Sequence, residues 1–520
     1  MTEKIREFIR REPRLLVALL IAAVYFLSML KYYQLDYFAP DFRLYAANAV
    51  KGQPAFTGFS SLFMLLAGLG TFIPEALHFF CLALIAASIY NILVFYDRVF
   101  APTNRNFAIS IAIMMSCCVW YYFYGKLFYE WPFTIYTYSI CLMLLGKALI
   151  NGRAGLDTQK PWLLFAAAMG LTLSWKPYNI FLVAGLGLLI LCNDETRGLF
   201  FSRVHSIKSF LSSLILFAAG YIGGNFNLLL RPRETLVGLL AYPARCGLTD
   251  FFLTKNSLAW DHVNLLPFHL AVMSLGATFL ILAVFPILAK KFRYLAVSSF
   301  MFLMLCIYIK RFSPGYPWHG FPFGGFIITF AMFLLHEGFP LRRAAKLVIS
   351  AVLVLQLFSA FVVYIPTQAK WHDATQRAID TLEEHENDIY EGTMHLIEDI
   401  GDSTFFIECA VKRFYPIPYS RTGYHWPSIE NPYIFRTAMM FVDPLYKTDF
   451  WAWKRMESLE GYKADEFEYV IFILPDAFTT MPDVANIYLY QHDPNYEAVN
   501  RIHGEGFQLL LYRRVVQDQF

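Results

Sequence analysis

Long apolar runs recur throughout the first 366 residues of this chain. Eleven of them approach or exceed the length needed to cross a hydrocarbon core about 30 Å thick. They are residues 14–33, 74–96, 106–123, 131–149, 161–175, 178–192, 207–229, 267–288, 293–309, 320–336 and 346–366. Hydrophobic residues make up 57% of the 520 residues and charged residues only 16%, which excludes an ordinary soluble domain. We therefore predict an all-α polytopic membrane domain of about eleven transmembrane helices.

The count depends on the short fifth and sixth runs, which only Lys176 and Pro177 separate. They are either two spans or one broken helix. Counted as two, they make every loop on the N-terminal side of the membrane short and basic, as cytoplasmic loops are, whereas merging them reverses this bias downstream. We therefore expect two spans, a cytoplasmic N-terminus and a multi-pass protein of the inner (plasma) membrane.

The composition changes sharply after the last apolar run. Residues 373–400 are rich in Asp and Glu, with apolar residues at helical spacing, which predicts a pair of amphipathic helices. Short apolar runs at 403–407, 469–474 and 508–512 are typical of strands. We predict a membrane domain over residues 1–368 and a soluble α/β domain over residues 369–520, on the periplasmic (exoplasmic) side.

A first candidate for chemistry, Asp41, follows the first apolar run. Pro40 can open a helix, and Tyr45 would then share a face with Asp41 at i+4. A carboxylate near the membrane surface can act as a general base toward a sugar hydroxyl. The alternative is an aspartate that caps a helix or compensates its dipole. Asp36, in the preceding loop, competes for the same role.

Two further candidates lie in turns on the same predicted side. Lys176 is flanked by apolar spans, where a cation costs free energy unless it reaches the headgroups or pairs with an anion. A functional role and simple snorkelling are both open for it. Glu130 occupies a tight turn before Trp131 and Pro132, and its alternative role is a structural ion pair with an arginine.

The remaining candidates are basic. Arg311 and His319 lie in an outer turn rich in Pro and Gly, and a guanidinium suits phosphate because its planar fork binds two oxygens at once. Arg231 and Arg233 lie in another outer segment. The sequence has no Cys or His pair at metal-ligand spacing and no phosphate-cradling Gly loop, so we expect neither a metal nor a cofactor.

The order of these features resembles the GT-C class of polytopic glycosyltransferases, which includes the lipid A aminoarabinose transferase and the protein O-mannosyltransferases. Such enzymes carry an Asp in the first outer loop with a Tyr four residues later, as Asp41 and Tyr45 do. They also have an acid in the second outer turn, a Lys in a middle outer turn and a late basic, proline-rich loop, as at Glu130, Lys176 and Arg311. Two departures, Phe42 and Ser61, fall where the family often has an acid and a proline.

The resemblance implies a metal-independent enzyme that moves a sugar, with inversion, from a polyprenyl phosphate to an acceptor hydroxyl on an envelope glycan, lipid or protein. Asp41 would be the base, and Lys176 and Arg311 would hold the donor phosphate. No nucleic-acid partner is implied. The alternatives are a flippase or transporter of an anionic glycolipid, and an O-antigen polymerase or ligase.

Overall fold

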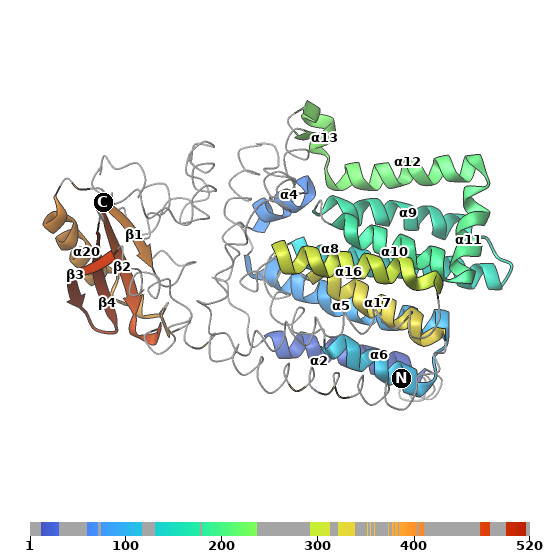
Figure 1. The fold of residues 1–520 in the computed structure, drawn as a ribbon, viewed down its shortest axis with the longest axis horizontal. Helices are drawn as coiled ribbons and strands as arrows, with labels where there is room; N and C mark the ends of the chain where they lie inside the picture. The colour runs from blue at the N-terminus through green and yellow to red at the C-terminus, as the bar shows by residue number, and fades with distance from the viewer. Residues whose placement is uncertain are drawn as a thin grey trace. The chain divides into compact units, whose positions relative to one another are not determined.

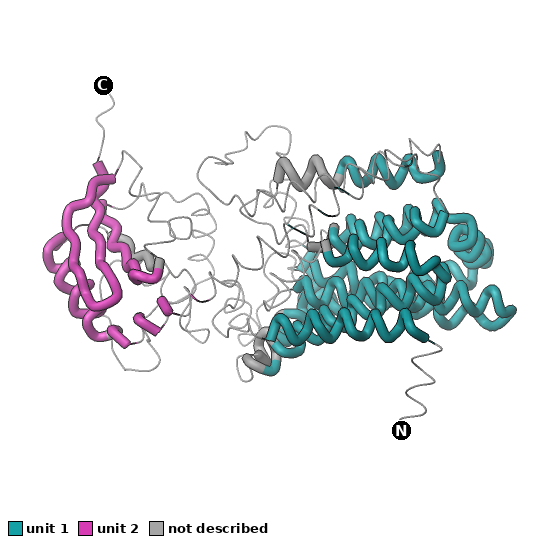
Figure 2. The backbone as a smooth tube through the Cα atoms, turned by 90° about the horizontal axis from the view of Figure 1, so that it is seen from below, with its two compact units in different colours: residues 1–35, 51–366 teal, residues 36–50, 367–520 magenta. Residues whose placement is uncertain are grey.

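The chain separates into two compact units, which Figure 2 colours separately. Unit 1 comprises residues 1–35 and 51–366, and unit 2 comprises residues 36–50 and 367–520. The computed structural model describes residues 12–30, 60–70, 74–116, 130–176, 179–233, 292–311, 321–337, 384–401, 405–409, 468–478 and 496–515, with some single positions between 235 and 403.

Unit 1 is a bundle of helices, most of which lie side by side (Figure 1). Its described helices are α2 (Pro13–Leu30), α4 (Ser61–Gly70), α5 (Pro74–Phe100), α6 (Asn104–Ser116), α8 (Glu130–Arg153), α9 (Gln159–Ser174), α10 (Ile180–Cys192), α11 (Asp194–Val204), α12 (Ile207–Gly224), α13 (Asn227–Leu230), η4 (Phe292–Tyr294), α16 (Leu295–Arg311) and α17 (Phe321–His336).

Each predicted apolar run that the structure describes contains a helix, as expected. Four described helices are long and apolar enough to cross a membrane: Pro13–Leu30, Phe79–Phe100, Glu130–Arg153 and Ile207–Gly224. The fifth and sixth runs are the separate helices α9 and α10, as expected from the charge of the loops. The runs at 267–288 and 346–366 lie almost wholly outside the described residues.

Helix α8 is the most enclosed of these helices. Its buried residues, among them Ile135, Tyr138 and Leu142, recur every three or four positions and also lie on more than one face. Helix α8 packs against α5, α9 and α17, which cover these faces. Tyr138 adds a hydrogen bond to Thr329 of α17, with its hydroxyl 3.0 Å from Oγ1 of that threonine.

Helices α9 and α12 run parallel and make the most extensive helix contact in unit 1. Small residues permit this contact. A Cβ added to Gly170 would come 1.9 Å from the carbonyl oxygen of Phe217, and one added to Gly220 would come 2.0 Å from that of Ala167. Close approach of this kind is how helices associate in lipid, where no hydrophobic driving force favours their contact.

At one end of the bundle, called the α11 end below, helix α11 lies across the ends of its neighbours (Figure 1). Asn193 caps it by accepting a hydrogen bond from the Thr196 backbone amide at 3.1 Å. Arg293 donates to Asp194 in its first turn and so lowers the pKa of that carboxyl. The sequence predicted only a short basic loop here; a capping asparagine followed by two acids in the first turn is the signal for this helix.

Unit 2 contains helix α20 (Glu386–Ile400) and a four-stranded sheet of β1 (Phe405–Cys409), β2 (Tyr469–Pro475), β3 (Tyr496–His503) and β4 (Phe507–Arg514). The order is β1-β2-β4-β3, with β1 parallel to β2 and the other pairs antiparallel. The predicted strands match β1, β2 and β4. Strand β3 was not predicted, because most of its residues are exposed and it therefore lacks an apolar stripe.

Candidate active site

The first turn of α8 contains a buried acid that is paired with a buried lysine. Glu130 is 0% exposed and Lys176, just beyond the end of α9, is 3% exposed; the lysine Nζ donates to Oε1 of Glu130. The carboxylate also lies at the positive end of the α8 dipole. Lys176 Nζ is 4.8 Å from the ring centroid of Trp131, a cation–π contact that further stabilises the ammonium.

This pairing answers the questions that the sequence left open about both residues. Lys176 does not snorkel to the surface, because its side chain is enclosed by protein. Among the described residues Glu130 pairs with a lysine, whereas the sequence suggested an arginine as its structural partner. The two residues are 46 positions apart, so their contact depends on how α8 and α9 pack.

Asn179 fixes the turn that carries Lys176. Its backbone amide donates to the carbonyl of Lys176 at 3.0 Å. Its side-chain amide donates to Oγ1 of Thr134, in α8, at 3.0 Å and to the backbone carbonyl of Thr172, in α9, at 2.9 Å. Asn179 is fully buried, so these bonds form away from water and tie α8, α9 and the start of α10 together.

Aromatic rings of residues close in sequence to Glu130 and Lys176 pack against one another. The ring of Phe133 lies 4.9 Å from that of Trp175 and 5.9 Å from that of Phe63, measured between centroids. Trp131 and Phe63 are both 0% exposed. Low polarity around an ion pair strengthens the attraction between its charges while raising the free-energy cost of removing either one.

Ser60 joins the start of α4 to this end of the bundle. Ser60 caps α4: its hydroxyl accepts from the Phe63 amide at 3.3 Å and donates to the Gly224 carbonyl, at the end of α12, at 2.7 Å. Asn225, the next residue, donates to the carbonyl of Ser174 at 3.1 Å. Ser60 is therefore tied to the same end of α9 that leads into Lys176.

Helix direction places the last residue of α16 at this end as well. The Cys192 thiol, at the end of α10, donates to the Arg293 carbonyl, just before α16, at 2.9 Å. Because α16 starts where α10 ends, it runs back toward the start of α10 and finishes with Arg311 at the end of the bundle that holds Glu130. We call this the Glu130 end; the side chain of Arg311 is outside the described part.

The other predicted site residues divide into two groups. Arg231 and Arg233 are exposed and follow α12 and α13, so they too lie at the Glu130 end. Asp41, Tyr45 and His319 lie outside the described residues. Among the described residues no group of three or more His, Cys, Asp or Glu side chains could hold a metal ion.

Sequence reasoning missed Asn179, Thr134 and Thr172, which hold the cluster together. Each is a single polar residue at the edge of, or within, an apolar run. A buried polar side chain must find a hydrogen-bond partner, so such isolated residues at similar membrane depth are the available signal. That signal predicts a polar contact without identifying the partner.

Comparison with known proteins gives one structural match and no match by sequence. No protein-family model matches the chain, and no curated protein matches it either. The structure matches the crystal structure of ArnT from Cupriavidus metallidurans bound to undecaprenyl phosphate, with a TM-score of 0.41 and 10% identity. The match covers 96% of this chain and 97% of the ArnT chain. The chain thus has a structural match over nearly its full length to ArnT, at low sequence identity.

Proposed function

We propose that this chain is a membrane glycosyltransferase that moves a sugar, with inversion, from a polyprenyl phosphate to an acceptor hydroxyl on an envelope glycan, lipid or protein. The proposal rests chiefly on the buried pair of Glu130 and Lys176, at the end of the bundle where Arg231, Arg233 and Arg311 also lie. A concentration of basic residues at one end of a membrane domain suits an anionic headgroup.

Asp41 is the proposed general base. It would take the proton of the acceptor hydroxyl as that oxygen attacks the anomeric carbon, and the sugar–phosphate bond would break on the opposite side. Tyr45, one helical turn further on, would support the acceptor. The nearest described residue on the C-terminal side is Ser60, which is tied to the end of α9.

The departing phosphate carries the charge that the enzyme must stabilise. Lys176 is buried and already paired with Glu130, so the pair has no net charge. We therefore assign the larger share of this stabilisation to Arg311, with His319, Arg231 and Arg233 as further donors, while Glu130 holds Lys176 in position. Arginine is suited to the task because its fork can donate two parallel hydrogen bonds to one phosphate.

The distribution of charge favours an enzyme over a transporter. In the described helices of unit 1 the Asp, Glu, Lys and Arg residues lie near the two ends of the bundle. A transporter of an anionic lipid is expected to carry ionisable residues close to the bilayer midplane. The described middle of the bundle holds instead neutral polar contacts such as that of Tyr138 with Thr329.

The direct test is transfer activity of the variant Asp41→Asn in membranes that contain the polyprenyl-phosphate donor. We expect transfer to fall by a factor of about 100 or more, because general-base catalysis contributes at least that much, with normal expression of the variant. Asp36→Asn is the matched control and should keep most of the activity. Unchanged transfer by Asp41→Asn would remove this residue from the mechanism.

A further inference from the structure

The α11 end of unit 1 carries a basic surface that the proposed reaction does not use. Helices α9 and α12 run parallel, so both begin there, and the Trp162 indole donates to the Ser213 hydroxyl at 3.1 Å within their first two turns. The partial positive charges of two helix N-termini are therefore close together. Helix α9 has 16 residues, so its length places this surface about 24 Å from Lys176.

Arg203 is the first basic residue of this surface. It lies in the last turn of α11, and its Nη2 donates to the Thr158 hydroxyl, immediately before α9. Among the described residues no carboxylate forms an ion pair with it, and its Nε is buried without a hydrogen-bond partner there. A partly buried guanidinium without a counter-charge favours the approach of an anion.

Two lysines extend the positive charge over the helix starts. Lys160 lies in the first turn of α9 and Lys208 in the first turn of α12, and both are exposed. His205 is exposed between α11 and α12. One acid, Asp157, also lies here and accepts from the Gln159 amide at 2.8 Å, so the three permanent cations outnumber it.

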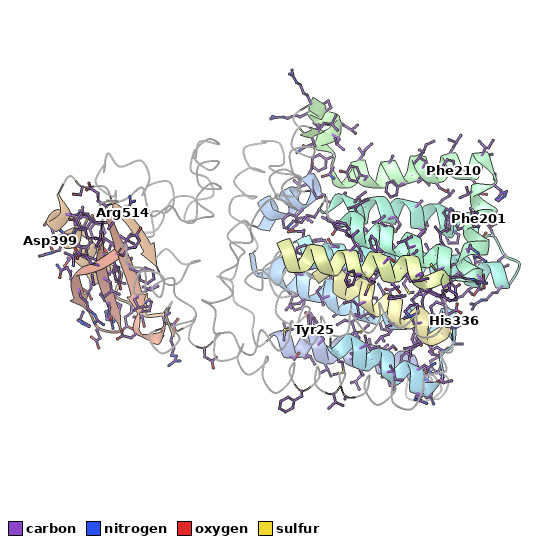
Figure 3. The ribbon with its side chains drawn as sticks, viewed as in Figure 1. Tyr25, Phe201, Phe210, His336, Asp399 and Arg514 are labelled. Atoms are coloured by element: carbon purple, nitrogen blue, oxygen red, sulfur yellow. The ribbon has the colours of Figure 1, made fainter. Side chains whose placement is uncertain are left out.

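Large apolar side chains surround these cations. Phe201 is 44% exposed, Ile207 76% and Phe210 46%. Figure 3 shows Phe201 on α11 and Phe210 at the start of α12, both at the α11 end. Exposed aromatic and aliphatic groups beside Lys and Arg are typical of a segment that lies at the boundary between headgroups and acyl chains.

We propose that this surface, formed by Lys160, Arg203 and Lys208 with Phe201, Ile207 and Phe210, binds the headgroup of an anionic phospholipid. The phosphate accepts hydrogen bonds from Arg203 and is attracted by both lysines and both helix N-termini. The acyl chains pack against the apolar side chains. Such a lipid would hold α11 and α12 to the rest of the bundle, and its binding does not depend on the proposed sugar transfer.

The test compares lipid retention by the full-length protein in nanodiscs of phosphatidylcholine alone and of phosphatidylcholine mixed with phosphatidylglycerol. Native mass spectrometry of the released protein counts the bound lipids. We expect wild type to retain phosphatidylglycerol in preference to phosphatidylcholine. The variant Arg203→Gln should lower this preference about fivefold, because each basic residue near an anionic surface contributes about that factor.

Two other variants make the result interpretable. Arg203→Gln also loses the contact with Thr158, so the double variant Lys160→Gln with Lys208→Gln tests the charge through exposed positions alone. Arg105→Gln is the control, because Arg105 is an exposed cation of α6 at the same end, beside the contact between Arg14 and Asn104. It should retain the wild-type preference. The proposal is overturned if wild type shows no preference, if the double variant keeps it, or if Arg105→Gln loses it equally.

Discussion

Glu130 and Lys176 form an ion pair inside the protein, between the first turn of α8 and the turn that joins α9 to α10. Both charges are removed from water. A buried pair of this kind adds little net stability, yet removal of one partner leaves an uncompensated charge in a medium of low polarity. The pair joins the start of α8 to the residue just beyond α9, at the end of the bundle where the proposed site lies.

The first prediction concerns the buried pair of Glu130 and Lys176. Either Glu130→Gln or Lys176→Met alone should lower the free energy of unfolding by about 3–5 kcal/mol, because each leaves one buried charge. The double variant should lose much less than the sum of the two. Thermal unfolding of the purified protein in detergent measures all three. Additive losses would show that the two side chains do not depend on each other.

A second prediction concerns Asn179, which bonds to Thr134 and to the carbonyl of Thr172. The variant Asn179→Ala should lose about 1–3 kcal/mol of stability, because the buried hydroxyl of Thr134 and the buried carbonyl of Thr172 each lose a hydrogen-bond donor. Asn151→Ala is the control: Asn151 also donates to a backbone carbonyl, that of Asp157 at 2.7 Å, but at an exposed site. Its loss should stay within about 0.5 kcal/mol. Equal losses at the two sites would show that the buried hydrogen bonds of Asn179 do not stabilise the contact of α8, α9 and α10.

The sequence predicted the described helices that coincide with the long apolar runs, and loop charge distinguished two short spans from one. Lys176 and Pro177 alone left one broken helix or two helices open; loop charge favoured two, and the structure has the separate helices α9 and α10. Helix α11 was missed, because its mixed composition provides no apolar stripe long enough to be recognised. Strand β3 was missed because both of its faces are largely exposed.

A third prediction tests the contact between α9 and α12 with two glycines of one helix. The variant Gly220→Ala should destabilise the protein, since the new Cβ would come 2.0 Å from the Ala167 carbonyl oxygen and would force the helices apart. Gly223→Ala should be neutral or should stabilise by up to about 1 kcal/mol, because nothing lies within 4 Å of its Cβ and alanine favours a helix. Thermal unfolding of both variants, side by side, gives the comparison. The same effect at both positions would show that the close contact is not required.

A fourth prediction concerns the turn between β3 and β4 in unit 2. Gly506 has a φ of +77°, and a Cβ there would come 2.9 Å from Cγ2 of Thr381. The variant Gly506→Ala should destabilise this turn by about 1–2 kcal/mol, because alanine disfavours the left-handed region. Hydrogen exchange of the β3 and β4 peptides in the full-length protein should become faster, while that of the α8 peptides stays the same. Unchanged exchange in β3 and β4 would contradict the role given to this glycine.

The candidate site was predicted only in part. Position in the chain was enough to place Glu130 and Lys176 at one end of the bundle, because the number of preceding spans determines the side of each turn. Chain position could not predict that Glu130 and Lys176 contact each other, because a contact across 46 residues is determined by the packing of α8 on α9. The bonds of Asn179 could not be predicted for the same reason.

The proposed sugar transfer is tested by the mass of the envelope glycans, lipids and proteins from cells with and without this chain. We predict that one acceptor loses the mass of a single sugar when the chain is absent. Wild type should restore that mass, and so should Asp36→Asn, whereas Asp41→Asn should not. Identical masses with and without the chain would exclude the proposed transfer, and full restoration by Asp41→Asn would exclude Asp41 as its base.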